Sequence, residues 1–255
     1  MYYIGIDMGS TCTKLVALDE TKNIFYKKVV PTGWNCVQTA EALQKELAAE
    51  GINRENMRCV ATGYGRQAIP YADRTITEIS CHGKGAHHLF PSDAAVVIDI
   101  GGQDTKIIEL KNGAVQNFIM NDKCSAGTGR FLEIMAGVLG VELCEMCEIA
   151  RKSTKRVSIS SMCTVFAESE VISLIGQGAD KADIARGIVE SIANKVKGQV
   201  GHVQLGSSRV YLTGGLCEVP FILEVLSERM ETPVMSAPNA RYAGAIGAAL
   251  YAAKQ

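Results

Sequence analysis

This sequence has few aromatic side chains, no long apolar run and no excess of charge of either sign. Aromatic residues make up 6% of the 255 residues. No apolar stretch reaches the roughly 18–20 residues that a membrane-spanning helix needs, and the first residues, Met1 to Asp7, lack the basic and apolar pattern of a signal peptide. The 26 basic and 27 acidic side chains include no basic block, which argues against nucleic acid. We therefore expect a cytoplasmic protein that binds neither a membrane nor nucleic acid.

Cysteine, in contrast, is abundant. The chain has nine cysteines, and structural disulfides are rare in the reducing cytoplasm. Soft metals are a common reason for such a content, although cysteines also serve as small apolar core residues. The hydrophobic fraction of 47% and the charged fraction of 21% are those of an ordinary globular protein.

Two segments, residues 7–14 and 99–106, share the pattern Asp-x-Gly-x-x-x-Thr-Lys. Apolar residues flank both, as expected for a strand, a tight turn and a returning strand. Glycine permits the turn and lets backbone N–H groups approach an anion. The two copies predict duplicated domains that face one another across a cleft. We expect residues 1–90 with 238–255 in the first domain and 91–237 in the second, with Ser80–Pro91 as the crossing point.

The rest of each half alternates between strand and helix patterns, which predicts the α/β class. In the first half we expect a strand at Asn23–Pro31, a helix at Val37–Glu50 and a strand at Arg58–Thr62. In the second half we expect strands at Ala114–Ile119 and Arg209–Thr213, helices beginning near Gly129, Phe166 and Lys181, and helices over Val141–Arg151, Val219–Met230 and Ala240–Ala253.

The glycine-rich turns are suited to ATP. Asp7 and Asp99, at strand ends, suit a hydrated Mg²⁺, and Gln103 or Asp104 is positioned to orient the attacking water. The other residues that we expect to contact the nucleotide come from the two turns and from a third glycine-rich segment: Gly9, Ser10, Thr11, Cys12, Thr13, Lys14, Gly101, Gly102, Gly214 and Gly215. The alternative interpretation is that these are only β-hairpin turns.

These motifs carry a first resemblance. Gly5-Ile6-Asp7-x-Gly9-Ser10-Thr11, Asp99-Ile100-Gly101-Gly102-Gln103-Asp104 and Leu212-Thr213-Gly214-Gly215 resemble the two phosphate motifs and the adenosine motif of the actin/hexokinase/Hsp70 superfamily. The resemblance implies a ribonuclease-H-like fold in each of two domains, with ATP or ADP between them. Arg241, near the presumed adenosine end, is a charged departure that either stacks on the base or faces solvent.

Cys124 and Cys163 each lie in a Ser- or Gly-rich turn that leads into a predicted helix. The free N–H groups of a helix N-terminus favour a thiolate and an anionic cluster. Two cysteines do not fill the four positions of a cubane cluster, whereas a two-fold dimer supplies four. The alternative is that both are residues of helix N-terminal turns without a metal.

The sequence around these cysteines carries a second resemblance. Residues 122–131 and 161–171 resemble the activator component of 2-hydroxyacyl-CoA dehydratases, in the BadF/BadG/BcrA/BcrD-type ATPase family that also holds the ATPase subunits of benzoyl-CoA reductase. The likeness runs from about Ile4 to Ala253. It implies a homodimer whose Cys124 and Cys163 hold one bridging [4Fe–4S] cluster. It also implies ATP-driven electron transfer to a dehydratase or related CoA-ester reductase, with ferredoxin or flavodoxin as the donor.

Two other functions use the same superfamily fold. A small-molecule kinase would need a larger substrate domain and a cleft base, and neither is evident. A non-enzymatic nucleotide switch or filament protein would use the same fold, and anaerobic purification separates these alternatives. The Cys144-x-x-Cys147 motif lies inside a predicted helix and has no second CxxC, so we interpret it as structural.

Overall fold

The computed structural model describes residues 1–203, 205–206 and 208–254. The chain divides into two compact units, each with a five-stranded sheet. Unit 1 comprises Met1–Asp93, Leu110–Gln116 and the C-terminal segment from Ala237; unit 2 comprises Ala94–Glu109 and Asn117–Ser236. Both units combine a mixed sheet with helices, which confirms the α/β class.

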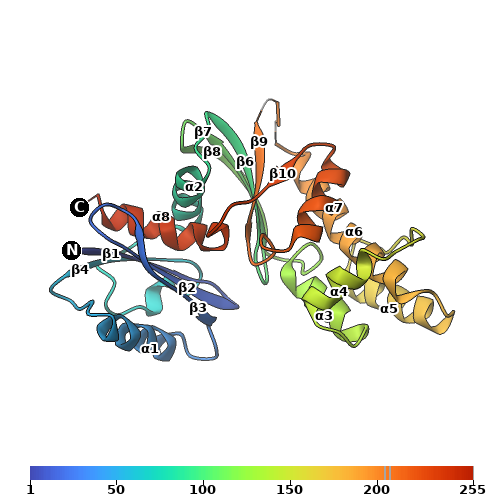
Figure 1. Cartoon of the computed structure of the whole chain (residues 1–255), viewed down its shortest axis with the longest axis horizontal. Helices are drawn as coiled ribbons and strands as arrows, with labels where there is room; N and C mark the ends of the chain where they lie inside the picture. The colour runs from blue at the N-terminus through green and yellow to red at the C-terminus, as the bar shows by residue number, and fades with distance from the viewer. Residues whose placement is uncertain (204, 207, 255) are drawn as a thin grey trace. The chain divides into compact units, whose positions relative to one another are not determined.

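The sheet of unit 1 has the order β3-β2-β1-β4-β5 (Figure 1). Its strands are β1 (Tyr2–Met8), β2 (Cys12–Leu18), β3 (Ile24–Pro31), β4 (Met57–Thr62) and β5 (Arg74–Thr75). β1, β2 and β3 form an antiparallel meander, whereas β4 runs parallel to β1 and β5 parallel to β4. The parallel pairing brings the ends of β1 and β4 to the same edge, where Asp7 lies opposite Thr62.

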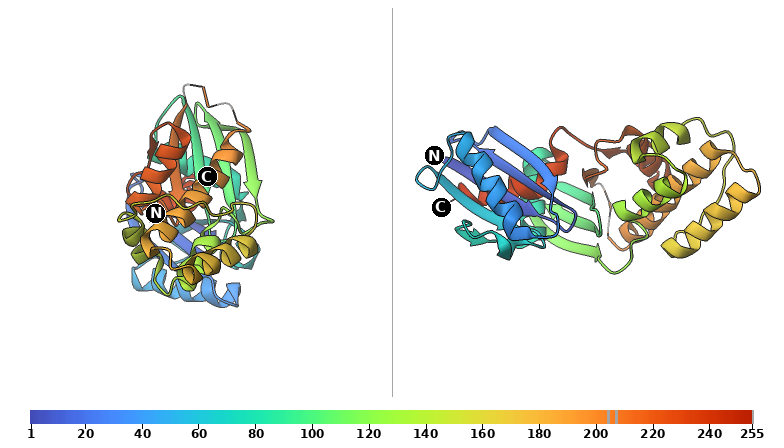
Figure 2. Two further views of the ribbon diagram at one scale, coloured as in Figure 1. Left: turned by 90° about the vertical axis from the view of Figure 1, so that its right-hand side faces the viewer. Right: turned by 90° about the horizontal axis from the view of Figure 1, so that it is seen from below.

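Helices cover both faces of this sheet (Figures 1 and 2). α1 (Cys36–Ala49), capped by the Asn35 side chain, packs Ala40, Leu43 and Leu47 into the core on one face. α8 (Ala243–Ala252) covers the other face and is preceded by the short 3-10 helix η2 (Ala240–Tyr242). α2 (Glu78–Leu89) packs along α8, and a second 3-10 helix, η1 (Arg66–Ala68), follows β4.

Glycines set the approach of α2 to α8. A Cβ at position 85 would lie 1.8 Å from the Ala243 carbonyl oxygen, and a Cβ at 247 would lie 1.7 Å from that of Cys81. The segment Ser80–Pro91, predicted as the crossing point between domains, is mostly helix α2 within unit 1, and the chain first passes to unit 2 just after it, between Asp93 and Ala94. Its glycines serve the close packing of α2 on α8.

Unit 2 has the sheet order β10-β9-β6-β7-β8 and a group of helices. Its strands are β6 (Ala94–Ile100), β7 (Thr105–Lys111), β8 (Ala114–Asn121), β9 (Arg209–Gly214) and β10 (Val234–Met235), and β7 and β8 extend into the segment counted with unit 1. Its helices are α3 (Gly129–Val138), α4 (Leu143–Ala150), α5 (Thr164–Gly176), α6 (Lys181–Val200) and α7 (Pro220–Met230). β6 runs parallel to β9, as β1 does to β4.

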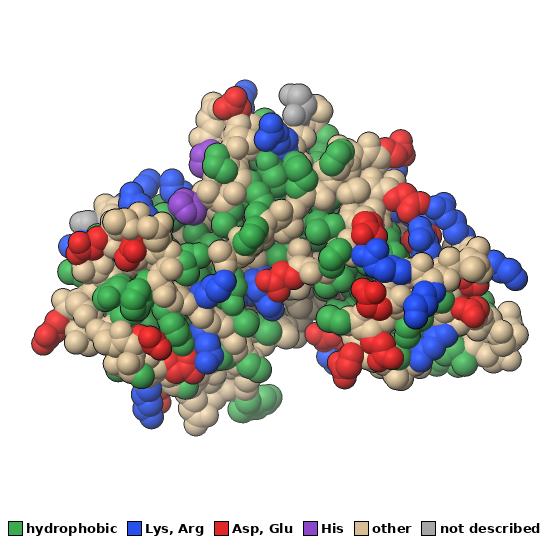
Figure 3. All heavy atoms as spheres, viewed as in Figure 1, with side chains coloured by type: hydrophobic (Ala, Val, Ile, Leu, Met, Phe, Trp, Pro, Cys, Tyr) green, Lys and Arg blue, Asp and Glu red, His purple; other side chains and the backbone are tan. Residues whose placement is uncertain are grey.

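Charged side chains of both signs intermingle over the helices of unit 2 (Figure 3). Arg151 of the basic segment after α4 pairs with Glu224 at 2.7 Å, and Arg186 pairs with Glu228 at 2.9 Å. These pairs join α6 and the end of α4 to α7.

The elements predicted from the sequence are confirmed to within three residues at each end. The predicted helices near Gly129 and Lys181 begin at those residues, and the helix predicted near Phe166 begins at Thr164. Within the described residues, no helix has the combined length and apolar character needed to span a membrane.

Replacing Gly247 by alanine is expected to destabilise the protein by at least about 1–3 kcal/mol, because the new methyl group meets backbone that has little freedom to move. Urea unfolding followed by circular dichroism measures the change. Gly198→Ala in α6 is the control, since nothing lies within 4 Å of its Cβ position and alanine there should stabilise the helix by roughly 0.5–1 kcal/mol. Equal effects of the two substitutions would contradict the close packing of α2 on α8.

Candidate functional site

Each unit has one strand–turn–strand segment of the same geometry. In unit 1 the turn between β1 and β2 closes with a hydrogen bond from Gly9 N to Cys12 O at 3.2 Å. In unit 2 the turn between β6 and β7 closes from Gly101 N to Asp104 O at 2.9 Å. The tips are exposed, so their backbone and hydroxyl groups are open to a ligand. The sequence repeat therefore corresponds to two equivalent turns.

The turn of unit 1 is held from behind by two threonines. The Thr32 hydroxyl donates to Gly9 O at 2.7 Å and contacts the Thr13 hydroxyl at 2.9 Å. A hydroxyl has one proton to donate, so Thr13 is the donor to Thr32. Thr13 is fully buried, so it positions the turn rather than facing a ligand, whereas Ser10 and Thr11 are exposed and Lys14 is half-buried.

Asp7, at the end of β1, is enclosed by two glycines. A Cβ at position 63 would lie 2.6 Å from Asp7 Oδ1, and a Cβ at 244 would lie 2.5 Å from Oδ2. Gly63 also has φ +86, which disfavours other residues. The two glycines come from the end of β4 and the first turn of α8, so elements far apart in the sequence surround this carboxylate. Arg241, in η2, is half-buried in the same unit.

Asp99, at the end of β6, lies in a buried network of charge. Lys106 Nζ is 3.3 Å from Asp99 Oδ2 and 2.7 Å from Asp104 Oδ2, and Lys106 is 1% exposed. The Thr213 hydroxyl donates to Asp99 Oδ1 at 3.2 Å. Gly214, with φ +84, leaves room for the same carboxylate, since a Cβ there would lie 2.7 Å from Asp99 Oδ1. Because a buried charge is costly without partners, these contacts hold Asp99 in one position.

The sequence reasoning missed Lys106 and Gly63, although the signal for both was present. Lys106 occupies the position of Lys14 in the repeated pattern, but it is buried between two carboxylates. Gly63 directly follows β4, and Gly214 is the last residue of β9. Each glycine comes after a threonine, and β4 and β9 pair in parallel with the central strands β1 and β6. Gln103 is exposed at the tip of its turn, whereas the Asp104 carboxylate is engaged by Lys106.

The turn of unit 2 is bonded directly to the start of α3. Gly129 N donates to Gly101 O, and Arg130 N donates to Gly102 O, both at 2.8 Å. The Thr105 hydroxyl donates to Gly127 O at 2.5 Å. A displacement of the turn therefore pulls on the first residues of α3 and on the segment before them.

The two candidate ligands lie in different local settings. Cys163 is the N-cap residue of α5, as expected. The α3 N-cap is Thr128, so Cys124 lies four residues before it, in the turn that leads into the helix. Its turn is held instead by Asn121, whose side chain donates to Cys124 O at 2.8 Å. The longer Ser- and Gly-rich segment forms this extra turn before the helix begins.

Tertiary structure brings the two cysteine loops together. The neighbouring hydroxyls of Ser125 and Thr164 are hydrogen-bonded at 2.7 Å, across 39 residues of sequence. Cys124 Sγ lies 3.9 Å from Met162 O, in the other loop. Both thiols are free and partly exposed. One small region of unit 2 thus presents two thiols to the surface.

An apolar surface borders these thiols. Met162, Val165 and Phe166 are 75%, 64% and 61% exposed, and Ile172 and Ile175 continue along α5 at 56% and 45%. We call these five residues the α5 stripe. Large apolar side chains that are exposed together mark a surface that binds another molecule.

The remaining cysteines are of a different kind. Burial, and to a smaller extent neighbouring Cys144, raises the pKa of the Cys147 thiol to about 11. Burial likewise raises the pKa of Cys59 and of Cys81 to about 12, which keeps these thiols protonated. Among the described residues no three His, Cys, Asp or Glu side chains gather as a possible metal-ligand set.

A mixed sheet in each unit, with one glycine turn beside a buried carboxylate, defines an ATPase of the actin-like fold. The structure of a ROK family glucokinase from Streptomyces griseus, in complex with glucose and AMPPNP, matches this chain with a TM-score of 0.61, and the match covers 100% of each chain. At 13% identity that likeness concerns the fold alone. More specifically, the chain belongs to the BadF/BadG/BcrA/BcrD ATPase family, whose model matches residues 4–252.

Two relatives within this family are much more similar. The (R)-2-hydroxyglutaryl-CoA dehydratase activating ATPase of Acidaminococcus fermentans is 44% identical over 257 residues, with 100% of this chain and 98% of that protein covered. The activator of the 2-hydroxyisocaproyl-CoA dehydratase from Clostridium difficile, solved with bound ADPNP, is 39% identical. Its TM-score is 0.92, and the match covers 100% of this chain and 95% of that one.

Proposed function

We propose that this chain is the ATP-dependent reductive activator of a 2-hydroxyacyl-CoA dehydratase or a related CoA-ester reductase. A [4Fe–4S] cluster held by a homodimer would supply the low-potential electron, and a ferredoxin or flavodoxin would replace it. The observation that carries this function is the pairing of the Cys124 and Cys163 loops through Ser125 and Thr164 at 2.7 Å. The printed names of the two similar relatives, both activators of dehydratases, support the choice of partner.

The residues present fit such a cluster. Thiolates are the usual ligands of iron–sulfur clusters, and a cubane takes four. One chain offers two partly exposed thiols in one region, and a two-fold axis through that region would supply the other two. Cys163 lies at the N-cap of α5, so the positive end of that helix dipole would face an anionic cluster.

The α5 stripe supports the dimer. An isologous contact requires a self-complementary patch near the axis, and the apolar stripe extends from Met162, next to Cys163, along α5. Burying it against a second copy would remove apolar side chains from water at the place where the thiols must meet. The ligands and the dimer surface thus lie side by side in the same element.

For the nucleotide, we assign both turns to phosphate binding, with Gly9, Ser10, Thr11 and Cys12 in one unit and Gly101 and Gly102 in the other. Asp7 and Asp99 hold a hydrated Mg²⁺, and Lys14 balances phosphate charge. Gln103 is better placed than Asp104 to orient water, because its side chain is exposed and that of Asp104 is paired with Lys106. Gly214, Gly215 and Arg241 are assigned to the adenosine end.

Coupling between nucleotide and thiols follows from contacts within unit 2. The phosphate turn accepts hydrogen bonds from Gly129 and Arg130 at the start of α3. The segment before α3 carries Cys124, and its neighbour Ser125 contacts Thr164 of α5. A nucleotide that shifts the Gly101–Gly102 turn therefore shifts both thiols. It acts by favouring one of two conformations.

Anaerobic purification tests this function. We expect a brown homodimer with about four irons per dimer, whose absorption or paramagnetic resonance spectrum differs between ATP and ADP. With a reduced ferredoxin and a purified dehydratase, electron transfer should require ATP. A colourless monomer after reconstitution with iron and sulfide would refute the proposal. Phosphorylation of a sugar by that colourless protein would favour a kinase instead.

A further inference from the structure

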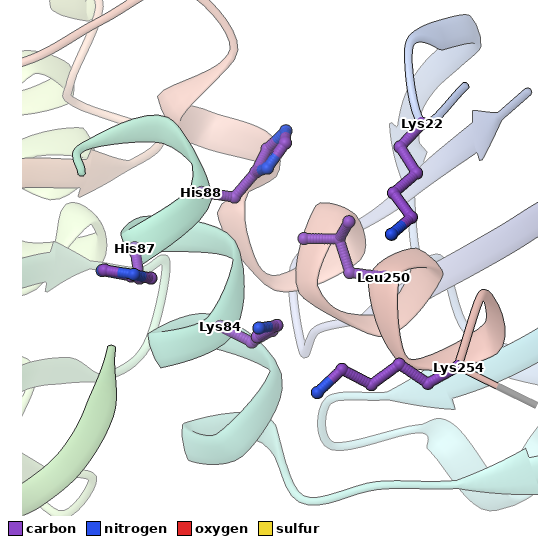
Figure 4. A pocket seen from close by; sticks show the side chains of 6 residues that line it. All are labelled: Lys22, Lys84, His87, His88, Leu250 and Lys254. Carbon is purple, nitrogen blue, oxygen red and sulfur yellow. The ribbon is translucent and has the colours of Figure 1, made fainter. Parts of the chain in front are cut away.

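A second polar site lies in unit 1, where a pocket of about 200 Å³ is lined by Lys22, Lys84, His87, His88, Leu250 and Lys254 (Figure 4). The residues come from the turn between β2 and β3, from α2 and from the end of α8. In the view of Figure 4 the three lysine side chains lie around Leu250, to its right (Lys22), its lower left (Lys84) and below it (Lys254), and His88 lies to its upper left. His87 is turned away, and a Cβ at Gly113 would lie 2.6 Å from its ring.

The lining carries positive charge without compensation. None of the six lining residues is acidic, and no ion pair joins Lys22, Lys84 or Lys254 to a carboxylate within the described part of the chain. The acidic residues of the nearby turn are engaged elsewhere. Asp19 accepts hydrogen bonds from Thr21 and Asn23, and Glu20 pairs with the N-terminal amine at 2.7 Å. Like charges that gather in this way repel one another.

Burial lowers the pKa of Lys84, and Lys254 and Lys22 lower it further. The positive charges of Lys254 and Lys22 thus act on Lys84 in the same direction as its burial. An anion placed among them would offset this repulsion and supply hydrogen-bond acceptors; at present Lys254 Nζ lies over the Tyr251 ring, 5.9 Å from its centroid.

The backbone that carries Lys22 and Lys84 has a defined conformation. Lys22 has φ +66, an uncommon conformation for a side-chain-bearing residue, and its N–H donates to Asp19 O at 3.0 Å. Lys84 lies between Gly83 and Gly85 on α2, and Gly85 allows the close approach of α2 to α8 described above. The packing of α2 on α8 therefore fixes the backbone that carries Lys84 relative to the end of α8 at Ala252, two residues before Lys254.

We propose that this pocket binds a doubly charged phosphate group, either free phosphate or the phosphate monoester of a small metabolite. Three ammonium groups and an imidazole suit the several oxygens of a phosphate. The small volume favours a single phosphate group over a polyphosphate chain. Both the site and its test are independent of the function proposed above.

Thermal unfolding in the presence of saturating ADPNP tests the site. The nucleotide then occupies the phosphate turns, so added phosphate does not act there. We expect inorganic phosphate to raise the unfolding midpoint of the unaltered protein by several degrees. The Lys84→Gln/Lys254→Gln double variant should need at least tenfold more phosphate for the same shift, and Lys22→Gln alone should weaken the response. Lys45→Gln, on the exposed side of α1, is the matched control and should behave as the unaltered protein.

Glycerol 3-phosphate, in a parallel titration, distinguishes the source of the phosphate, since tighter binding than inorganic phosphate would indicate a monoester. ATP hydrolysis and iron content should not change in these variants. An equal midpoint shift in the double variant, or an equal shift produced by chloride at matched ionic strength, would overturn the proposal.

Discussion

Replacing Cys163 or Cys124 by serine is expected to abolish iron binding and electron transfer while ATP binding persists. A serine hydroxyl does not replace a thiolate as a cluster ligand. If each chain supplies two of four ligands, one substitution removes two ligands from the dimer. Iron should fall from about two per chain to at most a tenth of that value. Iron and sulfide analysis after anaerobic purification measures the loss, and activation of a purified dehydratase should fall below detection.

Cys144→Ser is the matched control, because Cys144 is exposed on α4, outside the loops that Ser125 and Thr164 join. This variant should keep its iron and its activity. Binding of a fluorescent ATP analogue should be similar in all three variants, since none of the three cysteines belongs to a phosphate turn. Retention of full colour by both the Cys124 and the Cys163 variants would show that the ligand assignment is wrong.

The second large effect is expected from Asp99→Asn. This substitution keeps the shape of the side chain but removes the charge that we assign to Mg²⁺. Loss of a group that stabilises charge in a transition state costs about 10²–10³ in rate, so steady-state ATP hydrolysis should fall by about that factor. The fold should persist, because Lys106 keeps Asp104 as a partner at 2.7 Å.

Two measurements separate this result from simple unfolding. The thermal midpoint of Asp99→Asn should stay close to that of the unaltered protein, and its Mg²⁺ requirement should rise. Asp122→Asn, an exposed carboxylate of the same unit, should hydrolyse ATP at the unaltered rate. A folded Asp99→Asn protein that hydrolyses ATP within tenfold of the unaltered rate would exclude Asp99 from the site.

Local patterns were enough for the elements and the repeat. The strands and helices of both units were predicted from apolar spacing because each pattern reports a short-range periodicity. The Asp-x-Gly-x-x-x-Thr-Lys repeat predicted two equivalent turns because a tight turn is determined by its own few residues. The same reasoning did not show the packing within Ser80–Pro91. The segment was predicted as the crossing point between domains, and the chain passes between the units just after it, at Asp93–Ala94, whereas Gly85 serves helix packing.

The sequence by itself determined that this protein is an α/β ATPase with two related turns and two distinctive cysteine segments. Only the tertiary structure decided that Lys106 is buried between Asp99 and Asp104, that Gly63 and Gly244 enclose Asp7, and that the Cys124 and Cys163 loops meet. Turns and helices depend on neighbouring residues, which a sequence displays directly. These contacts join residues from separate strands and helices, and their positions follow from packing of the whole unit.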